Sequence, residues 1–225
     1  MHIPDGLMAP AVLALGWLLA LPFLMLANRK MEHAVNEENI PLMGVLAAGI
    51  FVAQMVNFPI GAGASGHLLG GVLAAVLLGP VAAIVVITCI LVIQCLLFGD
   101  GGIVALGLNI LNMAIIGVLV GWVVYTRLPV KEERIRIFAA SWASVFIASL
   151  ACAIQLSISY WLTGGEFGVD ASIALPFMLG YHAVIGIGEG VITTGVVAYL
   201  ATVSPEMMKL RKLELFPSDP VGVVD

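Results

Sequence analysis

Residues 67–98 read HLLGGVLAAVLLGPVAAIVVITCILVIQCLLF, an apolar run that contains no charged residue and is interrupted by Gly79-Pro80. The run predicts either one very long helix or a hairpin of two helices, because a proline in a helix interior breaks the backbone hydrogen-bond ladder. The two alternatives place every later part of the chain on opposite sides of a membrane. The charges outside this run therefore decide the fold.

The composition is that of a polytopic membrane protein. The chain has 225 residues, of which 61% are hydrophobic and 10% are charged, whereas a soluble domain carries about 25% charged residues. The composition argues against nucleic-acid binding, which depends on a basic face. No Lys or Arg precedes Arg29, so we expect no cleavable signal peptide and a retained N-terminus.

Charge placement favours the hairpin. Further apolar spans are predicted at residues 7–27, 41–56, 102–126, 134–163 and 172–203. With a hairpin at 67–98, all nine Lys and Arg residues fall on one side, whereas a single helix would place the later basic clusters opposite Arg29-Lys30. Because positive residues collect on the cytoplasmic side, we predict an all-α membrane protein with seven transmembrane helices, an outside N-terminus and a cytoplasmic C-terminus. A single transmembrane domain would cover residues 1–204, and a short cytoplasmic tail residues 205–225.

The first six residues, Met1-His2-Ile3-Pro4-Asp5-Gly6, predict half of a metal site. Pro4-Asp5-Gly6 is typical of a tight turn, which would fold residues 1–3 back against the following helix. A free amine on Met1, together with the backbone nitrogen and imidazole of His2, can chelate one divalent ion through two fused rings. This planar nitrogen set suits Ni(II) or Cu(II), whereas zinc prefers a tetrahedron and magnesium prefers oxygen. A fourth donor must come from elsewhere.

His67 is the predicted fourth donor. It follows a glycine-rich loop at residues 57–66 and lies on the same outer side as Met1 in the predicted topology. Short membrane segments are tolerated where they line a protein-covered cavity, which predicts a cavity near this loop. The alternative is a hydrogen-bonded histidine at the membrane boundary. Since the amine and imidazole bind metal only without their extra proton, we expect affinity to fall as the pH drops.

Four further polar residues in apolar spans are candidates for contacts around the site. His182 and Glu189 are seven residues apart and share a helix face, so they could pair or hold a ligand imidazole. Tight glycine-mediated packing of that helix is an equally good explanation. Asn109 and Asn112 lie one turn apart and could point into the pocket, although interhelical hydrogen bonding is the favoured role.

Several ordered motifs carry a resemblance to a known family. They are MHIPDG at 1–6, GHLLGG at 66–71, GDGG at 99–102, NILNM at 109–113 and HAVIGIGEG at 182–190. From the first residue to about Thr202, the chain resembles the substrate-binding (S) components of cobalt and nickel energy-coupling factor (ECF) transporters. The resemblance implies a six-helix fold with an extra N-terminal helix whose tip enters the pocket, and metal ligation by Met1, His2 and His67. It also implies three kinds of partner: a membrane coupling (T) subunit, cytoplasmic ATPase subunits and a small auxiliary membrane subunit.

The expected function is capture of Ni(II) or Co(II) at the outer face of a prokaryotic cytoplasmic membrane and ATP-driven import. The chain contains no G-x-x-x-x-G-K-[ST] loop, so ATP hydrolysis would belong to partner subunits, and neither an enzymatic activity nor a catalytic cofactor is expected. Planar nitrogen donors favour Ni(II) over Co(II), although Cu(II) would bind at least as tightly. The alternatives are a passive divalent-metal channel, an intramembrane enzyme that uses His182 and Glu189, and a vitamin-binding component of the same transporter class.

Overall fold

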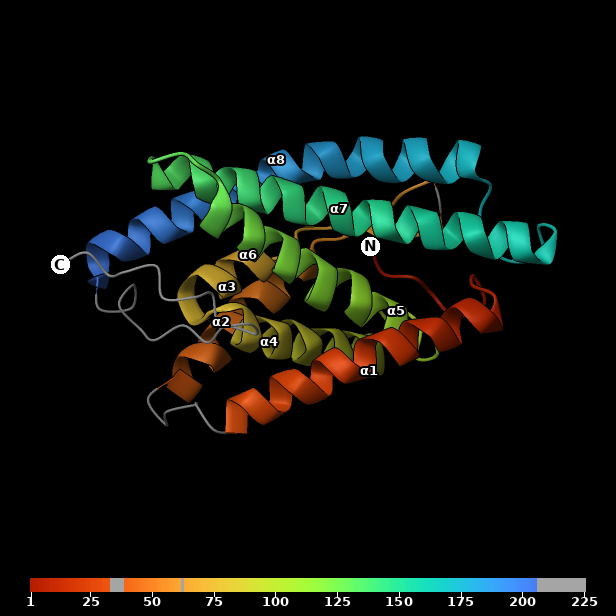
Figure 1. Ribbon diagram of the computed structural model, residues 1–225, viewed down its shortest axis with the longest axis horizontal. Coiled ribbons are helices and arrows are strands. Elements are labelled where there is room, and N and C mark those ends of the chain that lie inside the picture. Colours follow the sequence, from red (N-terminus) through yellow and green to blue (C-terminus); the bar gives the residue numbers. More distant parts are fainter. Residues whose placement is uncertain (33–38, 62, 206–225) are drawn as a thin grey trace.

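The computed structural model describes residues 1–32, 39–61 and 63–205, which form a bundle of helices with one small hairpin of strands (Figure 1). The helices are α1 (Pro10–Glu32), α2 (Asn39–Met55), α3 (Gly71–Leu78), α4 (Pro80–Ile93), α5 (Leu106–Asn109), α6 (Val118–Arg127), α7 (Glu133–Thr163) and α8 (Ala171–Val203), with π-helices η1 (Gln94–Phe98) and η2 (Ile110–Gly117). Strands β1 (Phe58–Pro59) and β2 (Ser65–Gly66) pair antiparallel. Most of the predicted tail at 205–225 and of the polar link at 31–39 lies outside the described residues.

The break predicted at Gly79-Pro80 is confirmed. Helix α3 ends at Leu78, Gly79 has a φ of 85°, and α4 begins with Pro80. A left-handed φ suits glycine because it has no Cβ, and proline suits the first helical position, where its missing N–H would have no partner. The two helices pack against each other. Residues 67–98 are therefore not one long helix.

Helix α3 is shorter than predicted, because it begins at Gly71 and residues 67–70 are not helical. Gly70 has a φ of 73°, and a Cβ at this position would lie 2.5 Å from the Ile50 side chain. The backbone N–H groups of Leu69 and Gly70 are bonded to the Glu189 side chain, so they do not need a helical partner. Tertiary hydrogen bonds thus replace the predicted first turn.

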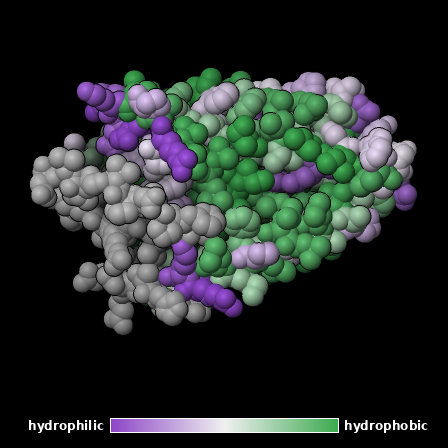
Figure 2. Space-filling model, viewed as in Figure 1, coloured by the Kyte–Doolittle hydropathy of each residue, from purple (hydrophilic) through white to green (hydrophobic). Residues whose placement is uncertain are grey.

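Five helical segments are long and apolar enough to cross a membrane. They cover residues 10–31, 80–98, 106–127, 133–163 and 171–203, and α2 is a shorter apolar helix. Figure 2 shows a broad hydrophobic band between more hydrophilic ends. The chain is therefore a polytopic membrane protein. The count of seven spans and their orientation stay predictions, since α2 and the eight-residue α3 fall below the spanning length.

The bundle encloses the beginning of its own chain. Helices α7 and α8 pack along each other, and α1 packs against α4 and α5. The N-terminus lies between these groups rather than at the edge of the molecule (Figure 1), and Met1 and Ile3 belong to the hydrophobic core. The ends of α1, α6 and α8 lie at the opposite end of the molecule from the start of α8. This arrangement brings residues 1–6 next to the loops at 57–70 and 99–105.

Candidate metal centre

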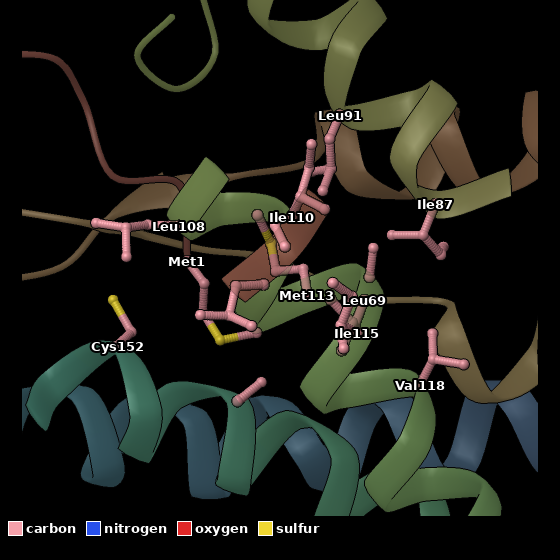
Figure 3. Close-up of a cluster of buried hydrophobic side chains, with 14 of the residues drawn as sticks. Met1, Leu69, Ile87, Leu91, Leu108, Ile110, Met113, Ile115, Val118 and Cys152 are labelled. Carbon is pink, nitrogen blue, oxygen red and sulfur yellow. The ribbon is translucent and has the colours of Figure 1, made fainter. Parts of the chain in front are cut away.

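The first three residues are buried inside the bundle. Met1 and Ile3 are 0% exposed and His2 is 4% exposed. Figure 3 shows Met1 in a cluster of apolar side chains that includes Met113 and Cys152. Complete burial of a methionine side chain contributes about 1.5–3 kcal/mol through the hydrophobic effect. The burial of the apolar Met1 side chain therefore favours a position of the chain in which the polar amine is buried too.

The backbone of Ile3 is paired with the start of the helix that runs from Leu106 to Arg127. Its N–H donates to Oδ1 of Asn109 at 2.8 Å, and its carbonyl accepts from Nδ2 of Asn109 at 3.1 Å. The same carbonyl accepts from the N–H of Gly102 at 2.9 Å. Both polar groups of this buried peptide are thus satisfied, and the segment is fixed in position.

Asp5 caps this helix from a distant part of the chain. Its carboxylate accepts hydrogen bonds from the N–H groups of Ile103, Val104 and Ala105 at 2.9, 2.9 and 3.1 Å. The first turn of a helix leaves such donors without partners and favours a negative charge. The sequence pattern predicts Asp5 only as a turn residue. Its contacts explain why the helix begins at Leu106, later than the predicted residue 102.

Ser65 links the N-terminus to the loop that carries His67. The Met1 amine donates to the Ser65 carbonyl and, at 3.3 Å, to its Oγ. The His2 N–H donates to the same Oγ at 3.2 Å. The two nitrogens that would begin a chelate therefore both point at one residue, which lies two positions before His67.

The imidazoles of His2 and His67 lie side by side. Their ring centroids are 4.6 Å apart with the planes tilted by 34°, and both rings are buried. Nδ1 of His67 is 2.6 Å from the carbonyl oxygen of Leu68, an acceptor that places the ring proton on Nδ1. Nε2 of His67 therefore carries a lone pair, and neither Nε2 atom has a hydrogen-bond partner. Buried polar atoms without partners are rare and point to a missing ligand.

Asp100 lies at the outer rim of this pair. Its Oδ2 is 3.6 Å from Nε2 of His2 and accepts a hydrogen bond from Nδ2 of Asn57 at 2.6 Å. Asp100 is the only Asp, Glu, Lys or Arg between Glu38 and Arg127, and it was not among the predicted site residues. A single carboxylate in a long apolar region is the sequence signal that indicates a functional role for Asp100.

Burial keeps the nitrogen donors neutral. Desolvation lowers the pKa of the Met1 amine to about 5, although Cys152 and Asp100 act against the shift. Desolvation, followed by the nearby amine, also lowers the pKa of His2 and of His67 well below their usual range. Burial raises the pKa of Asp100. Metals bind the deprotonated forms of amines and imidazoles, so the three nitrogen donors are in a binding-competent state near neutral pH.

The predicted donors Met1, His2 and His67 are thus brought together by the fold. In the described ranges, no three His, Cys, Asp or Glu side chains converge as a metal cluster. The Met1 amine and the His2 backbone nitrogen lie beside these side chains, at Ser65.

The two predicted asparagines have different partners. Asn109 binds Ile3 as described, whereas Asn112 exchanges two hydrogen bonds of 2.7 Å with the amide of Gln155 on α7. The interhelical role is confirmed for Asn112. Asn109 instead holds the segment that carries Met1 and His2.

His182 and Glu189 are both buried but do not bond each other. Nδ1 of His182 lies 2.7 Å from the Met178 carbonyl, and its Nε2 has no partner. The Glu189 carboxylate accepts from the N–H groups of Leu69 and Gly70 at 2.7 and 2.6 Å. The suggestion that the two side chains pair is therefore wrong.

Three known proteins are similar to this chain over most of its length. A protein of Haloquadratum walsbyi named for metal transport is 40% identical over 208 residues, covering 92% of this chain and 93% of the relative. The fused nickel transport protein NikMN of Rhodobacter capsulatus is 36% identical over 230 residues, covering 96% of this chain and 66% of the relative. A crystal structure of a truncated transition metal transporter superposes with a TM-score of 0.85 at 36% identity, covering 90% of this chain and 99% of that one.

A more distant structure shares the fold. The S component of a bacterial ECF transporter superposes with a TM-score of 0.54 at 20% identity, covering 73% of this chain and 96% of that one. The model of the CbiM family, described as the cobalt uptake substrate-specific transmembrane region, matches residues 2–207. This match spans the helices, His67 and all but the first of the predicted ligands. The chain therefore belongs to the CbiM family.

Proposed function

We propose that the protein is the substrate-capture component of an ECF transporter that imports Ni(II) or Co(II). The observation that carries this proposal is the convergence of a buried amine and two buried imidazoles, with an unpartnered Nε2 on His67, in one small region. Relatives named for nickel transport and metal transport support the choice of cargo.

In the proposed complex, the Met1 amine and the backbone nitrogen and imidazole of His2 form two fused chelate rings. His2 binds through Nδ1, because this nitrogen closes a small ring with its own backbone nitrogen. Its Nε2 then faces Asp100, and a carboxylate beside a ligating imidazole orients the ring and raises its basicity. Nε2 of His67 completes the plane. The metal replaces the protons that the amine and amide now share with Ser65.

The planar set favours Ni(II) over Co(II) on geometry. Cu(II) would bind the same donors at least as tightly by the Irving–Williams order. We therefore propose that discrimination against copper depends on metal availability or on the transport step. Asn109 and Glu189 act as supporting contacts in this proposal, because each holds a segment that carries a ligand.

Import would need partners. The chain has no phosphate-binding loop of the G-x-x-x-x-G-K-[ST] type, so we infer separate cytoplasmic ATPase subunits, a T subunit and a small auxiliary membrane subunit. The shared fold with an S component supports this assignment. We propose a prokaryotic cytoplasmic membrane location, with the metal site facing outward and residues 205–225 as a cytoplasmic tail.

The contacts of Glu189 disfavour an intramembrane enzyme, because its carboxylate is engaged by backbone N–H groups and does not reach His182 as an acid–base partner. A passive channel would need polar groups that continue from the site toward the far end. The residues of α3 are all apolar or glycine, which disfavours that route.

Isothermal titration of the purified protein with Ni(II) and with Co(II) tests the proposal. We expect tight binding of at least one ion, and its loss in His2→Ala and His67→Ala. His33→Ala is the matched control, because its sequence position predicts the opposite side of the membrane from the site. A wild-type protein that binds neither ion would contradict the proposal.

A further inference from the structure

His67 is carried by a non-helical peptide whose polar groups are satisfied by two helices. The two oxygens of the Glu189 carboxylate, on α8, accept from the N–H groups of Leu69 and Gly70 at 2.7 and 2.6 Å. From α2, Nε2 of Gln54 donates to the Leu69 carbonyl at 2.7 Å. The peptide between residues 67 and 71 is thus held by hydrogen bonds to two helices, α2 and α8.

One further hydrogen bond links this peptide to the imidazole of His67. The Leu68 carbonyl, which lies between His67 and the gripped peptide, receives the proton on Nδ1 of His67 at 2.6 Å. That bond fixes both the ring orientation and the tautomer, and it leaves the Nε2 lone pair free. A shift of the 68–70 backbone would therefore move the Nε2 lone pair.

The chemistry of Glu189 suits this task. Among the described residues it is the only Asp or Glu that is buried, with 2% of its surface exposed. A buried carboxylate is stable only when it is compensated, and short bonds from two N–H groups are roughly twice as strong as neutral ones. A glutamine here would turn one acceptor into a donor that faces another donor. The shape of the side chain would stay nearly the same, but it could no longer accept both hydrogen bonds from Leu69 and Gly70.

The competing explanation is a purely structural one. The N-cap of α3 is Gly70, which offers no side-chain cap, so Glu189 could serve only to anchor the start of that helix. A structural anchor would affect thermal stability without changing how the folded protein binds metal. The two explanations therefore predict different measurements.

We propose that Glu189 is a positioning residue for metal binding, which acts by holding residues 68–70 so that Nε2 of His67 completes the ligand plane. The inference rests on the proposed function, because it assumes that His67 is a ligand. Gln54 acts on the same peptide through a single neutral hydrogen bond, so its contribution is the smaller one.

The test compares the Ni(II) dissociation constant and visible spectrum of the wild type, Glu189→Gln, Gln54→Met and the control Thr193→Val. Thr193 is buried on the same helix, one turn beyond Glu189. Loss of an outer-shell partner weakens metal affinity about 10- to 100-fold, which is the effect expected for Glu189→Gln. Gln54→Met should show a smaller loss, and Thr193→Val none. The spectrum of Glu189→Gln should shift from that of planar four-nitrogen nickel toward that of His67→Ala.

The double variant Glu189→Gln/His67→Ala, titrated at high nickel concentration, separates the two explanations. If Glu189 acts through His67, the double variant binds nickel as weakly as His67→Ala alone. Additive losses, or a folded Glu189→Gln protein with wild-type affinity and spectrum, would overturn the inference. If Glu189→Gln does not fold, wild-type affinity in Gln54→Met would overturn it. Absence of nickel and cobalt binding in the wild type would instead overturn the proposed function itself.

Discussion

The two halves of the candidate centre are built in different ways. The N-terminal half offers three nitrogens from two consecutive residues, and it is held by backbone and side-chain hydrogen bonds to Gly102 and Asn109. The other half offers one imidazole, on a peptide gripped by Gln54 and Glu189 from two helices. The first half depends on a free chain end, and the second depends on the bundle around it.

The N-terminal half would bind metal by local chelation, whereas His67 would bind only if the fold positions it. Three donors on one short chain can chelate a metal wherever they are, although weakly, because ring closure is local. A single imidazole contributes only if the protein holds it at the right point. Changes to Met1 or His2 should therefore remove ligands and abolish tight binding. Changes to the residues that hold the ligand segments in place should weaken metal affinity only partly.

The largest effect is expected from extending the chain before Met1. A short extension of two alanines converts the amine into an amide and adds bulk where Met1 is 0% exposed. Nickel binding should fall below the limit of calorimetry, while circular dichroism still reports a folded helical protein. A C-terminal extension of the same length is the control. Unchanged affinity after the N-terminal extension would show that the amine is not a ligand.

The next effect is expected from Asp5→Ala. This change removes three hydrogen bonds from N–H groups at the start of a helix. The loss of a helix cap costs about 0.5–2 kcal/mol, which corresponds to a weakening of nickel binding by about tenfold if it loosens the segment. Asp5→Asn, which keeps one acceptor oxygen, should fall between Ala and the wild type. Equal affinities of all three proteins would show that the segment is held without Asp5.

A pH series should distinguish the buried amine from a free one. With the Met1 pKa lowered from 8.0 to about 5, metal binding at pH 7 needs to remove only the proton of the His2 amide. Affinity should therefore rise about tenfold per pH unit near neutrality, with about one proton released per ion. Below about pH 5 the amine becomes protonated, so the fall should become steeper. Calorimetry in buffers of different ionisation enthalpy counts the protons, and a steep region that begins near pH 8 would contradict the burial of the amine.

The smallest effect on nickel affinity is expected from a change at Asn109, and none is expected from the same change at Asn112. Asn109→Ala removes both side-chain bonds to Ile3, and each such bond contributes about 0.5–1.5 kcal/mol. Nickel binding should weaken about fivefold, which is the lower end of this range for two bonds, because the Ile3 carbonyl keeps its bond from Gly102. Asn112→Ala breaks only the pair with Gln155, so it should lower the melting temperature and leave nickel affinity unchanged. A loss of affinity in Asn112→Ala as large as in Asn109→Ala would erase the distinction.

Local chemistry made part of the structure predictable. The break at Gly79-Pro80 follows from backbone constraints. Metal ligation by Met1 and His2, which rests on ring closure, stays a prediction. Charge asymmetry then placed His67 on the same side as Met1, and the fold brings their segments into contact. These inferences needed no knowledge of packing.

Contacts between distant segments could not be predicted. Asp5 reaches residues 103–105, and Glu189 reaches Leu69, across about 100 residues or more of sequence in each case. Each contact also moves a helix start, from 102 to 106 and from 67 to 71. Helix boundaries here depend on which side chain captures the first N–H groups, and sequence periodicity does not contain that information.

The π-helix η2 (Ile110–Gly117) sets the rotational phase of the span in which it lies. At its N-terminal end Asn109 contacts Ile3, and at its C-terminal end the Gly117 carbonyl accepts from Oγ of Ser144 on α7. In a regular helix each residue turns the chain by about 100°. A π-helical turn (i→i+5) holds one residue more than an α-helical turn (i→i+4), so η2 takes up this extra residue without rotating the Asn109 end relative to the Ser144 end. A change of one residue in the length of this span is therefore most easily absorbed within η2, and the contacts of Asn109 and Gly117 at its two ends would keep their relative direction.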